Sequence, residues 1–184
     1  FTPLAKWEDN GEIFESNIVS IIERRNGEIW ISGNVLCRLN IKNNQLTVQQ
    51  INASITSPGY MIEDRKLNIW MSKGEEGLYR LDPDNRLSLY LSKDNGYINS
   101  ICEDPQGNIY VGSMRKGLFA YEKKSDTFVP VDFKEKKELP VSFLYSASPN
   151  ELYIGTDGKG MNIYNNKTHE ISEYRFDNSY FDSN

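Results

Sequence analysis

The residues able to do acid–base or metal chemistry are few in this sequence. His169 is the only histidine among the 184 residues. A Ser-His-Asp or Cys-His arrangement would therefore depend on it, and a metal site with several histidine ligands is excluded within the chain. It stands just before a short apolar run, which favours a solvated residue at the edge of a sheet.

Two loops resemble ligand-binding motifs only superficially. The glycine-rich stretch 155–160 suggests a phosphate-cradling loop, but Met161 stands where a P-loop has its Lys. The stretch 82–85 carries carboxylates of the kind that bind calcium, but Arg86 and Leu87 follow where a calcium loop needs a ligand and a glycine. We interpret both stretches as turns between strands and predict no metal and no cofactor.

Paired acids occur at Glu63-Asp64 and again at Glu103-Asp104. Such pairs can do general acid–base work. Because the same pair returns before an equivalent turn, we interpret it as structural, with carboxylates bonding the backbone of that turn. Catalysis would need one copy that differs from the others.

Composition narrows the function classes. The sequence is 38% hydrophobic and 12% aromatic, which is typical of an ordinary globular fold and not of disorder. Its net charge of -5 argues against nucleic acid and anionic membrane surfaces as partners. No apolar run approaches the roughly 20 residues of a membrane span, and the sequence opens on Phe1 without a signal-peptide pattern. We therefore expect a segment of a longer protein. Cys37 and Cys102 lack metal-ligand spacing and are expected to be small core residues.

The elements that position these residues come from an internal repeat. The run Ile29-Trp30-Ile31-Ser32 returns at 69–72, 109–112 and 152–155 at a nearly constant interval. Each unit contains four short runs that are rich in β-branched and aromatic side chains and separated by Gly, Asn, Asp or Pro. Four antiparallel strands in about 40 residues are typical of one propeller blade.

The sequence thus predicts an all-β fold, a β-propeller of about four four-stranded antiparallel blades at approximately residues 17–51, 59–92, 98–133 and 141–176. Because a lone sheet leaves both faces wet, we expect neighbouring blades to bury the aromatic series Trp30, Trp70, Tyr110 and Tyr153. Residues 1–7 are predicted to form the outer strand of a preceding blade, and residues 177–184 the loop into a next one. This organisation predicts an open arc of a larger propeller, whose exposed sheet surfaces favour self-association.

The third unit, Ile101 to Ser113 followed by Gly117-Leu118-Phe119, resembles the two-component regulator propeller repeat. The fourth unit matches well from Leu152 to Gly160, whereas the second carries Leu67 for the turn glycine and the first lacks the Gly-Leu pair. The resemblance implies a periplasmic sensor region of a hybrid histidine kinase of the Bacteroidetes type, anchored in a membrane. It also implies further blades, signalling domains on the parent chain, and oligosaccharide ligands.

A ligand in such a fold would sit where two sets of loops emerge around the central axis, namely those entering the innermost strands and those joining the second and third strands. Residues that differ between blades on that face are the candidates, because mixed charge beside aromatic rings suits a sugar. They are Tyr60, Lys73, Glu75, Glu76, Tyr97, Asn99, Met114, Arg115, Lys116, Asp157 and Lys159.

Three function classes follow. The leading hypothesis is a non-catalytic, glycan-sensing segment of a two-component sensor. The alternative is a scaffold or dimerisation propeller that binds a protein or a second copy of itself. The third is a propeller polysaccharide lyase or glycosidase, for which the sequence offers no copy with an unusual His, Tyr or acid constellation.

Overall fold

The structure is a computed structural model that describes residues 8–9, 12–13, 17–42, 45–133, 139–158 and 160–174, with side chains from residue 17 onward except those of residues 41–47. Its regular elements in these ranges are strands and two 3₁₀ turns. None of the described helical segments is long and apolar enough to cross a membrane. The predicted all-β class is confirmed.

The strands form four antiparallel sheets of four, each with its strands in sequence order, as predicted. Blade 1 consists of β3 (Ser20–Glu23), β4 (Ile29–Ser32), β5 (Cys37–Lys42) and β6 (Gln45–Gln50). Blade 2 consists of β7 (Met61–Glu63), β8 (Ile69–Ser72), β9 (Gly77–Leu81) and β10 (Leu87–Ser92). Blade 3 consists of β11 (Ile98–Glu103), β12 (Ile109–Ser113), β13 (Gly117–Glu122) and β14 (Thr127–Pro130). Blade 4 consists of β15 (Val141–Ser148), β16 (Glu151–Thr156), β17 (Met161–Asn165) and β18 (Glu170–Tyr174).

Some short elements were not predicted. A small hairpin pairs β1 (Glu8–Asp9) with β2 (Glu12–Ile13), and two 3₁₀ turns, η1 (Gly74–Glu76) and η2 (Lys93–Asn95), flank the strands of blade 2. The predicted outer strand at 1–7 and the predicted loop at 177–184 lie outside the described residues.

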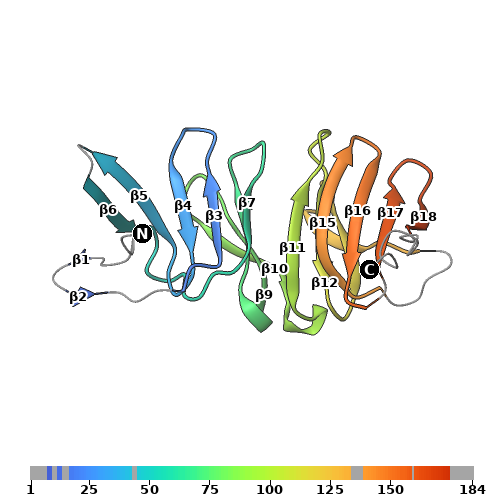
Figure 1. The fold of residues 1–184 in the computed structure, drawn as a ribbon, viewed down its shortest axis with the longest axis horizontal. Helices are drawn as coiled ribbons and strands as arrows, with labels where there is room; N and C mark the ends of the chain where they lie inside the picture. Colours follow the sequence, from blue (N-terminus) through green and yellow to red (C-terminus); the bar gives the residue numbers. More distant parts are fainter. Residues whose placement is uncertain are drawn as a thin grey trace, which may run out of the picture.

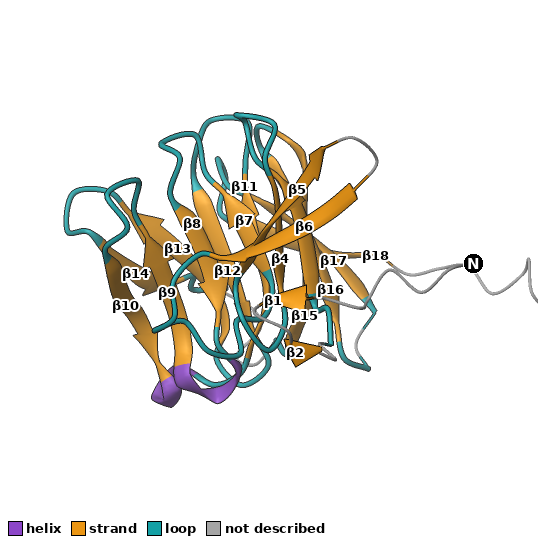
Figure 2. Ribbon diagram, turned by 90° about the vertical axis from the view of Figure 1, so that its left-hand side faces the viewer, coloured by secondary structure: helices purple, strands orange, loops and turns teal. Residues whose placement is uncertain are grey.

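The four sheets stand side by side in an arc (Figure 1). The first strands of the blades, β3, β7, β11 and β15, lie together in the middle of the view, and β6 and β18, the last strands of blades 1 and 4, lie towards its left and right ends. The turns between the first and second strands lie at one edge of the sheets, the upper edge in Figure 1. The 3₁₀ turns η1 and η2 lie at the opposite edge, the lower one in Figure 2.

The core consists of three apolar seams, one between each pair of neighbouring sheets. In the first, Trp30 of blade 1 packs with Met61 and Met71 of blade 2. In the second, Trp70 joins a cluster with Ile101 and Phe128 of blade 3, and its ring meets that of Phe128 edge-on. In the third, Tyr110 packs with Leu144 and Ile154 of blade 4. Burial between sheets therefore supplies most of the hydrophobic stabilisation.

The expectation that the fourth aromatic residue is buried like the others was wrong. Tyr153 is only partly buried, and it lies on the face of blade 4 that points away from blade 3. Its ring contacts that of Tyr145, which is exposed. The reason is that burial of this aromatic depends on a following sheet, and the described residues contain none.

The turn between the first two strands of a blade requires a residue in the left-handed backbone region. Gly27 and Gly107 occupy this position with φ of 81° and 79°. In blade 2 the same position holds Leu67, with φ of 65°. A leucine side chain strains this conformation, whereas glycine does not.

Candidate functional site

The loops that enter the first strands and those that join the second and third strands meet on one face, as predicted. We name this the loop face, formed by residues 59–60, 73–76, 93–97, 114–116, 140–142 and 157. The Met114 N–H donates to the Tyr97 carbonyl at 3.1 Å, and the Ser113 hydroxyl donates to the Asn95 carbonyl at 2.6 Å. The Asp157 N–H likewise reaches the Pro140 carbonyl at 3.2 Å. Each loop is thus held by its neighbour.

Gly96 allows the closest of these approaches. Its φ is 79°, and a Cβ on it would lie 2.9 Å from both the Arg115 Cβ and the Ser113 Oγ. Glycine is therefore required both by the backbone conformation and by the space. The consequence is that the backbone of residues 96–97 packs against residues 113–115.

The predicted ligand-binding residues divide by exposure. Tyr60 and Tyr97 are 48% and 47% exposed, enough to offer a ring face to a ligand. Four exposed charged candidates have no side-chain partner among the described residues, and they are Glu75, Arg115, Lys116 and Asp157. Asn99 is partly buried. Lys159 lies outside the described residues.

Three other candidates are already engaged. The Lys73 ammonium bonds the Glu76 carboxylate at 2.8 Å and lies 5.7 Å from the centre of the Tyr79 ring. The bond from Lys73 holds the pKa of Glu76 below its usual range. The Met114 sulfur accepts the Ser142 hydroxyl of blade 4 at 3.7 Å. The exposed candidates that remain without a side-chain partner among the described residues are therefore Tyr60, Glu75, Tyr97, Arg115, Lys116 and Asp157.

The opposite face, which we name the turn face, is formed by turns 24–28, 64–68 and 104–108, and it carries the repeated acids Glu63-Asp64 and Glu103-Asp104. One Asp64 oxygen accepts the N–H groups of Lys66 and Asn68 at 2.8 and 2.9 Å. The other accepts the Asn68 amide and the Trp70 indole N–H, both at 2.8 Å. Asp104 bonds Gln106 and Asn108 in the same way. The structural interpretation of these aspartates is confirmed.

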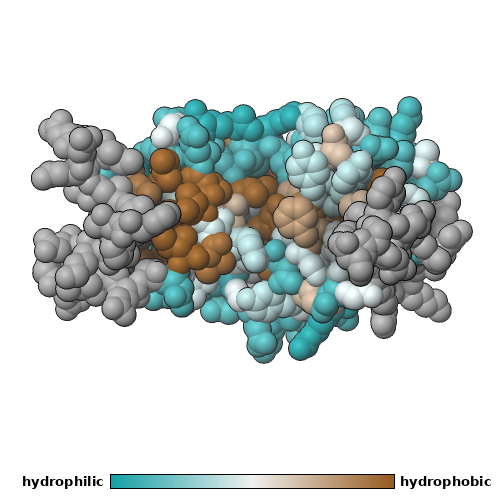
Figure 3. All heavy atoms as spheres, viewed as in Figure 1, coloured by the Kyte–Doolittle hydropathy of each residue, from teal (hydrophilic) through white to brown (hydrophobic). Residues whose placement is uncertain are grey.

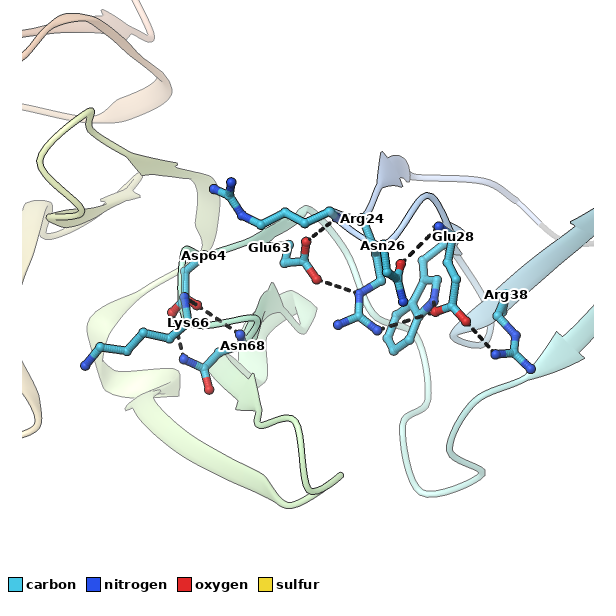
Figure 4. Close-up of polar contacts among 10 residues, drawn as sticks. Arg24, Asn26, Glu28, Arg38, Glu63, Asp64, Lys66 and Asn68 are labelled. Atoms are coloured by element: carbon cyan, nitrogen blue, oxygen red, sulfur yellow. Dashed lines mark hydrogen bonds and ion pairs between the residues drawn. The ribbon is translucent and has the colours of Figure 1, made fainter.

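The neighbouring glutamates join one blade to the next, which the sequence did not reveal. Glu63 of blade 2 accepts the Arg25 N–H of blade 1 at 2.6 Å and the Arg24 Nε at 2.7 Å (Figure 4). Glu103 of blade 3 accepts the Arg65 N–H of blade 2 at 3.1 Å. The only sequence signal was the arginine that stands in the turn of the preceding repeat unit in both cases.

The turn of blade 1 lacks the aspartate of blades 2 and 3. Arg24 and Glu28 replace the Asp and Asn of those two turns, and Glu28 takes over as acceptor of the Trp30 indole N–H at 3.0 Å. Arg38 also donates to Glu28, at 2.6 Å, while the Arg24 guanidinium lies 4.3 Å from the centre of the Trp30 ring. Burial raises the pKa of Glu28, but the bonds from Arg38 and Trp30 outweigh it and leave the pKa below the usual value. The carboxylate is therefore a bonded structural anion (Figure 4).

A third polar cluster lies at the outer edge of the second seam. Asp126 accepts the hydroxyls of Tyr121 and, at 2.9 Å, of Tyr90, and pairs with Arg80 at 3.3 Å. The bond from Tyr121 is the main cause that lowers the pKa of Asp126. These groups satisfy one another, so they also serve the fold.

The remaining chemical candidates are structural as well. His169 is an exposed turn residue whose Nδ1 lies 2.9 Å from the Tyr164 hydroxyl. The stretch 82–85 is a turn in which the Asp82 carboxylate accepts the Arg86 N–H at 2.8 Å. Cys37 and Cys102 are buried in the core, as predicted. Among the described residues no three His, Cys, Asp or Glu side chains are grouped so that they could hold a metal ion.

An open depression between the first two turns is lined by Ile22, Glu23, Arg24, Arg25, Gly27, Ile62 and Glu63. The charged groups of Arg24 and Glu63 bond each other across it. The depression therefore offers few unsatisfied groups to a ligand.

Comparison with protein families gives one match. Residues 92–115 match the family model described as two component regulator propeller. The matched segment overlaps the third repeat unit and confirms the resemblance found in the sequence. A comparison with the curated proteins gave no match.

Solved structures share the fold at low sequence identity. Virginiamycin B lyase from Staphylococcus aureus aligns with a TM-score of 0.70 at 15% identity, over 88% of this chain and 56% of that one. The extracellular domain assigned to a one-component system of B. thetaiotaomicron aligns with a TM-score of 0.63 at 18% identity, over 87% of this chain and 22% of that one. A hybrid two-component extracellular domain from the same organism gives 0.66 at 12%, over 89% and 25%. This chain thus spans about half of the lyase and about a quarter of the two extracellular domains.

Proposed function

We propose that this chain, which carries a two-component regulator propeller repeat, is a ligand-sensing segment of a larger extracytoplasmic propeller in a two-component sensor. We propose further that its ligand is an oligosaccharide, bound at the loop face without turnover. The family match and the fold shared with extracellular sensor domains support the first part. The whole sensor, with its further blades, membrane anchor and signalling domains, belongs to the same proposal.

The observation that carries the ligand proposal is the contrast between the two faces. On the turn face the carboxylates of Glu63, Asp64, Glu103 and Asp104 are bonded within the fold. On the loop face two exposed tyrosines stand among charged groups that differ from blade to blade and have no described partner. Exposed aromatic rings can stack on sugar rings while charged groups bond hydroxyls, which is the usual division of labour in a small-ligand site.

The test is thermal stabilisation of the complete ectodomain by a panel of glycan fragments, with product analysis of the same mixtures. A binding fragment raises the unfolding midpoint in proportion to the logarithm of its concentration. Tyr97→Ala should remove this shift, while Tyr174→Ala, an exposed tyrosine of the outer strand β18, should keep it. A panel without any shift, or a shift accompanied by product, would contradict the proposal.

The structural similarity to virginiamycin B lyase raises the alternative that this chain is a catalytic propeller. The position of its histidine argues against that alternative. One of those structures is a catalytically inactive histidine-to-alanine variant of virginiamycin B lyase with quinupristin. Here the only histidine, His169, lies in the turn between β17 and β18 and is paired with Tyr164. We therefore place binding ahead of catalysis.

A second candidate function is self-association or a scaffold role. The outward face of blade 4 exposes Phe143 and Tyr145, and the outward face of blade 1 exposes Ile21. Apolar sheet faces of this kind promote association. Sedimentation of the 184-residue chain over a range of concentrations would support this role if the mass rises, and exclude it if the chain stays a monomer.

A further inference from the structure

The seams within the chain follow one hydrogen-bonding rule. Glu63 and Glu103 lie one repeat unit apart and pair with Ile69 and Ile109 on the next strand, so they occupy the same position in their blades. Each accepts a backbone N–H from the turn of the preceding blade, at Arg25 or Arg65. These donors are also one repeat unit apart, so the bond is a property of the repeat.

The third seam shows what happens when the donor is missing. Pro105 occupies the position of Arg25 and Arg65, and proline has no N–H to donate. In the next blade the glutamate position, opposite Leu152, holds Ser146. That seam is bonded differently, through the Ser100 hydroxyl, which accepts the Leu144 N–H at 2.9 Å, and through the Asn166 amide, which reaches Asp104 at 3.3 Å. A carboxylate is thus present where an N–H faces it and absent where none does.

Glu23 occupies the same position in blade 1, one repeat unit before Glu63 and opposite Ile29. It is exposed and has no polar partner among the described residues. Two residues earlier, Ile21 is 62% exposed, whereas its equivalents Met61, Ile101 and Leu144 are 3%, 8% and 4% exposed because the preceding blade covers them. Figure 3 shows apolar surface over β3 and β4 of this blade.

We propose that the outward face of blade 1 is the acceptor side of a fourth seam, and that it binds a further blade of the same polypeptide through Ile21 and Glu23. The turn of that blade donates a backbone N–H to the Glu23 carboxylate, so its residue at the position of Arg25 and Arg65 is not proline. An apolar or aromatic side chain of its second strand covers Ile21. The inference rests on the proposed membership of a larger propeller and adds which residue of this chain joins the blade and by which bond.

The test is thermal unfolding of two proteins, the 184-residue chain and the complete ectodomain, each with Glu23→Ala, Glu63→Ala or Glu122→Ala. Glu63→Ala breaks a seam inside the chain and should lower the midpoint of both proteins by about 2–4 °C. Glu23→Ala should lower the midpoint of the ectodomain by a similar amount and leave that of the 184-residue chain unchanged. Glu122, an exposed residue whose only described side-chain partner is Ser125, should have little effect in either protein.

Three outcomes overturn the proposal. An ectodomain insensitive to Glu23→Ala would show that Glu23 is solvated. A 184-residue chain destabilised by Glu23→Ala would show a partner within the chain, and a concentration-dependent effect in that chain would show that a second copy occupies the face. Glycan stabilisation, measured on the same Glu23→Ala ectodomain, should persist, so that failure of the seam and failure of the sensing proposal are told apart.

Discussion

Replacement of Asp64 by alanine tests whether the repeated acidic residue serves the fold. Its carboxylate accepts two turn N–H groups, the Asn68 amide and the Trp70 indole N–H. Asp64 is buried, and Trp70 is 1% exposed, so water cannot replace the lost acceptor at the indole. An orphaned buried donor costs about 1–3 kcal/mol, and each turn bond contributes about 1 kcal/mol net. We expect Asp64→Ala to lower the free energy of unfolding by about 4 kcal/mol.

Asp104→Ala is the matched control. Asp104 makes the same bonds to its turn, but Tyr110 replaces the tryptophan, so no indole N–H is orphaned. Its additional donor, the Asn166 amide at 3.3 Å, keeps a second acceptor in the Pro149 carbonyl at 2.9 Å. We expect a smaller cost, about 2 kcal/mol. Urea unfolding followed by far-ultraviolet circular dichroism measures both, provided that the slope with urea is unchanged.

The same substitution in a Trp70→Phe chain measures the contribution of the indole hydrogen bond alone. In a Trp70→Phe chain there is no N–H for Asp64 to accept, so Asp64→Ala should cost about 2 kcal/mol less than in the parent. The reasoning would be refuted if Asp64→Ala and Asp104→Ala lowered the free energy of unfolding equally. It would also be refuted if the loss caused by Asp64→Ala were the same with Trp and with Phe at position 70.

Three further predictions concern single features. Leu67→Gly should raise the unfolding free energy by about 1 kcal/mol, because it removes the backbone strain of a leucine in the left-handed region, where Gly27 and Gly107 stand in other blades. A lower midpoint of thermal unfolding would contradict this. Glu28 has a lowered pKa when folded, so its stabilising effect is present above the unfolded pKa and is lost as pH falls through the folded value; the stability gap between the parent and Glu28→Gln should therefore shrink from about pH 6 to about pH 3. Pro105→Ala with Ser146→Glu should create the missing seam bond, and a double-mutant cycle should show coupling of about 1 kcal/mol, which would be zero if the seam rule were wrong.

The sequence predicted the strands and their sheets because both follow from local information. Recurrence at a constant interval identifies Trp30, Trp70 and Tyr110 as equivalent, and equivalent residues in a repeat occupy equivalent positions. The same reasoning identified the aspartates as turn acceptors, because a turn is completed within a short stretch of chain. The prediction that Tyr153 is buried failed because the burial of this side chain depends on a neighbouring sheet and not on its own blade.

The contacts of Glu63 and Glu103 could not be predicted from one repeat unit. Each glutamate bonds a residue 38 positions earlier, and only the stacking of blades brings the two together. The same limit applies to the loop face. Recurrence predicted which loops share a face, but not that Lys73 and Glu76 would bond each other while Arg115 and Lys116 remain exposed.

The distribution of bonded and unbonded groups explains how one repeat can carry both stability and function. Turn-face carboxylates such as Asp104 and Glu103 are fixed by bonds within the turn and between neighbouring blades, so replacement there changes stability first. On the loop face, the backbone bonds that hold Met114 and Asp157 involve no variable side chain. Side chains such as Tyr97 and Arg115 can therefore differ between blades at little cost to the fold. A binding site that varies without loss of the propeller is expected on that face, and the Tyr97→Ala ectodomain is the variant that should lose ligand and keep its stability.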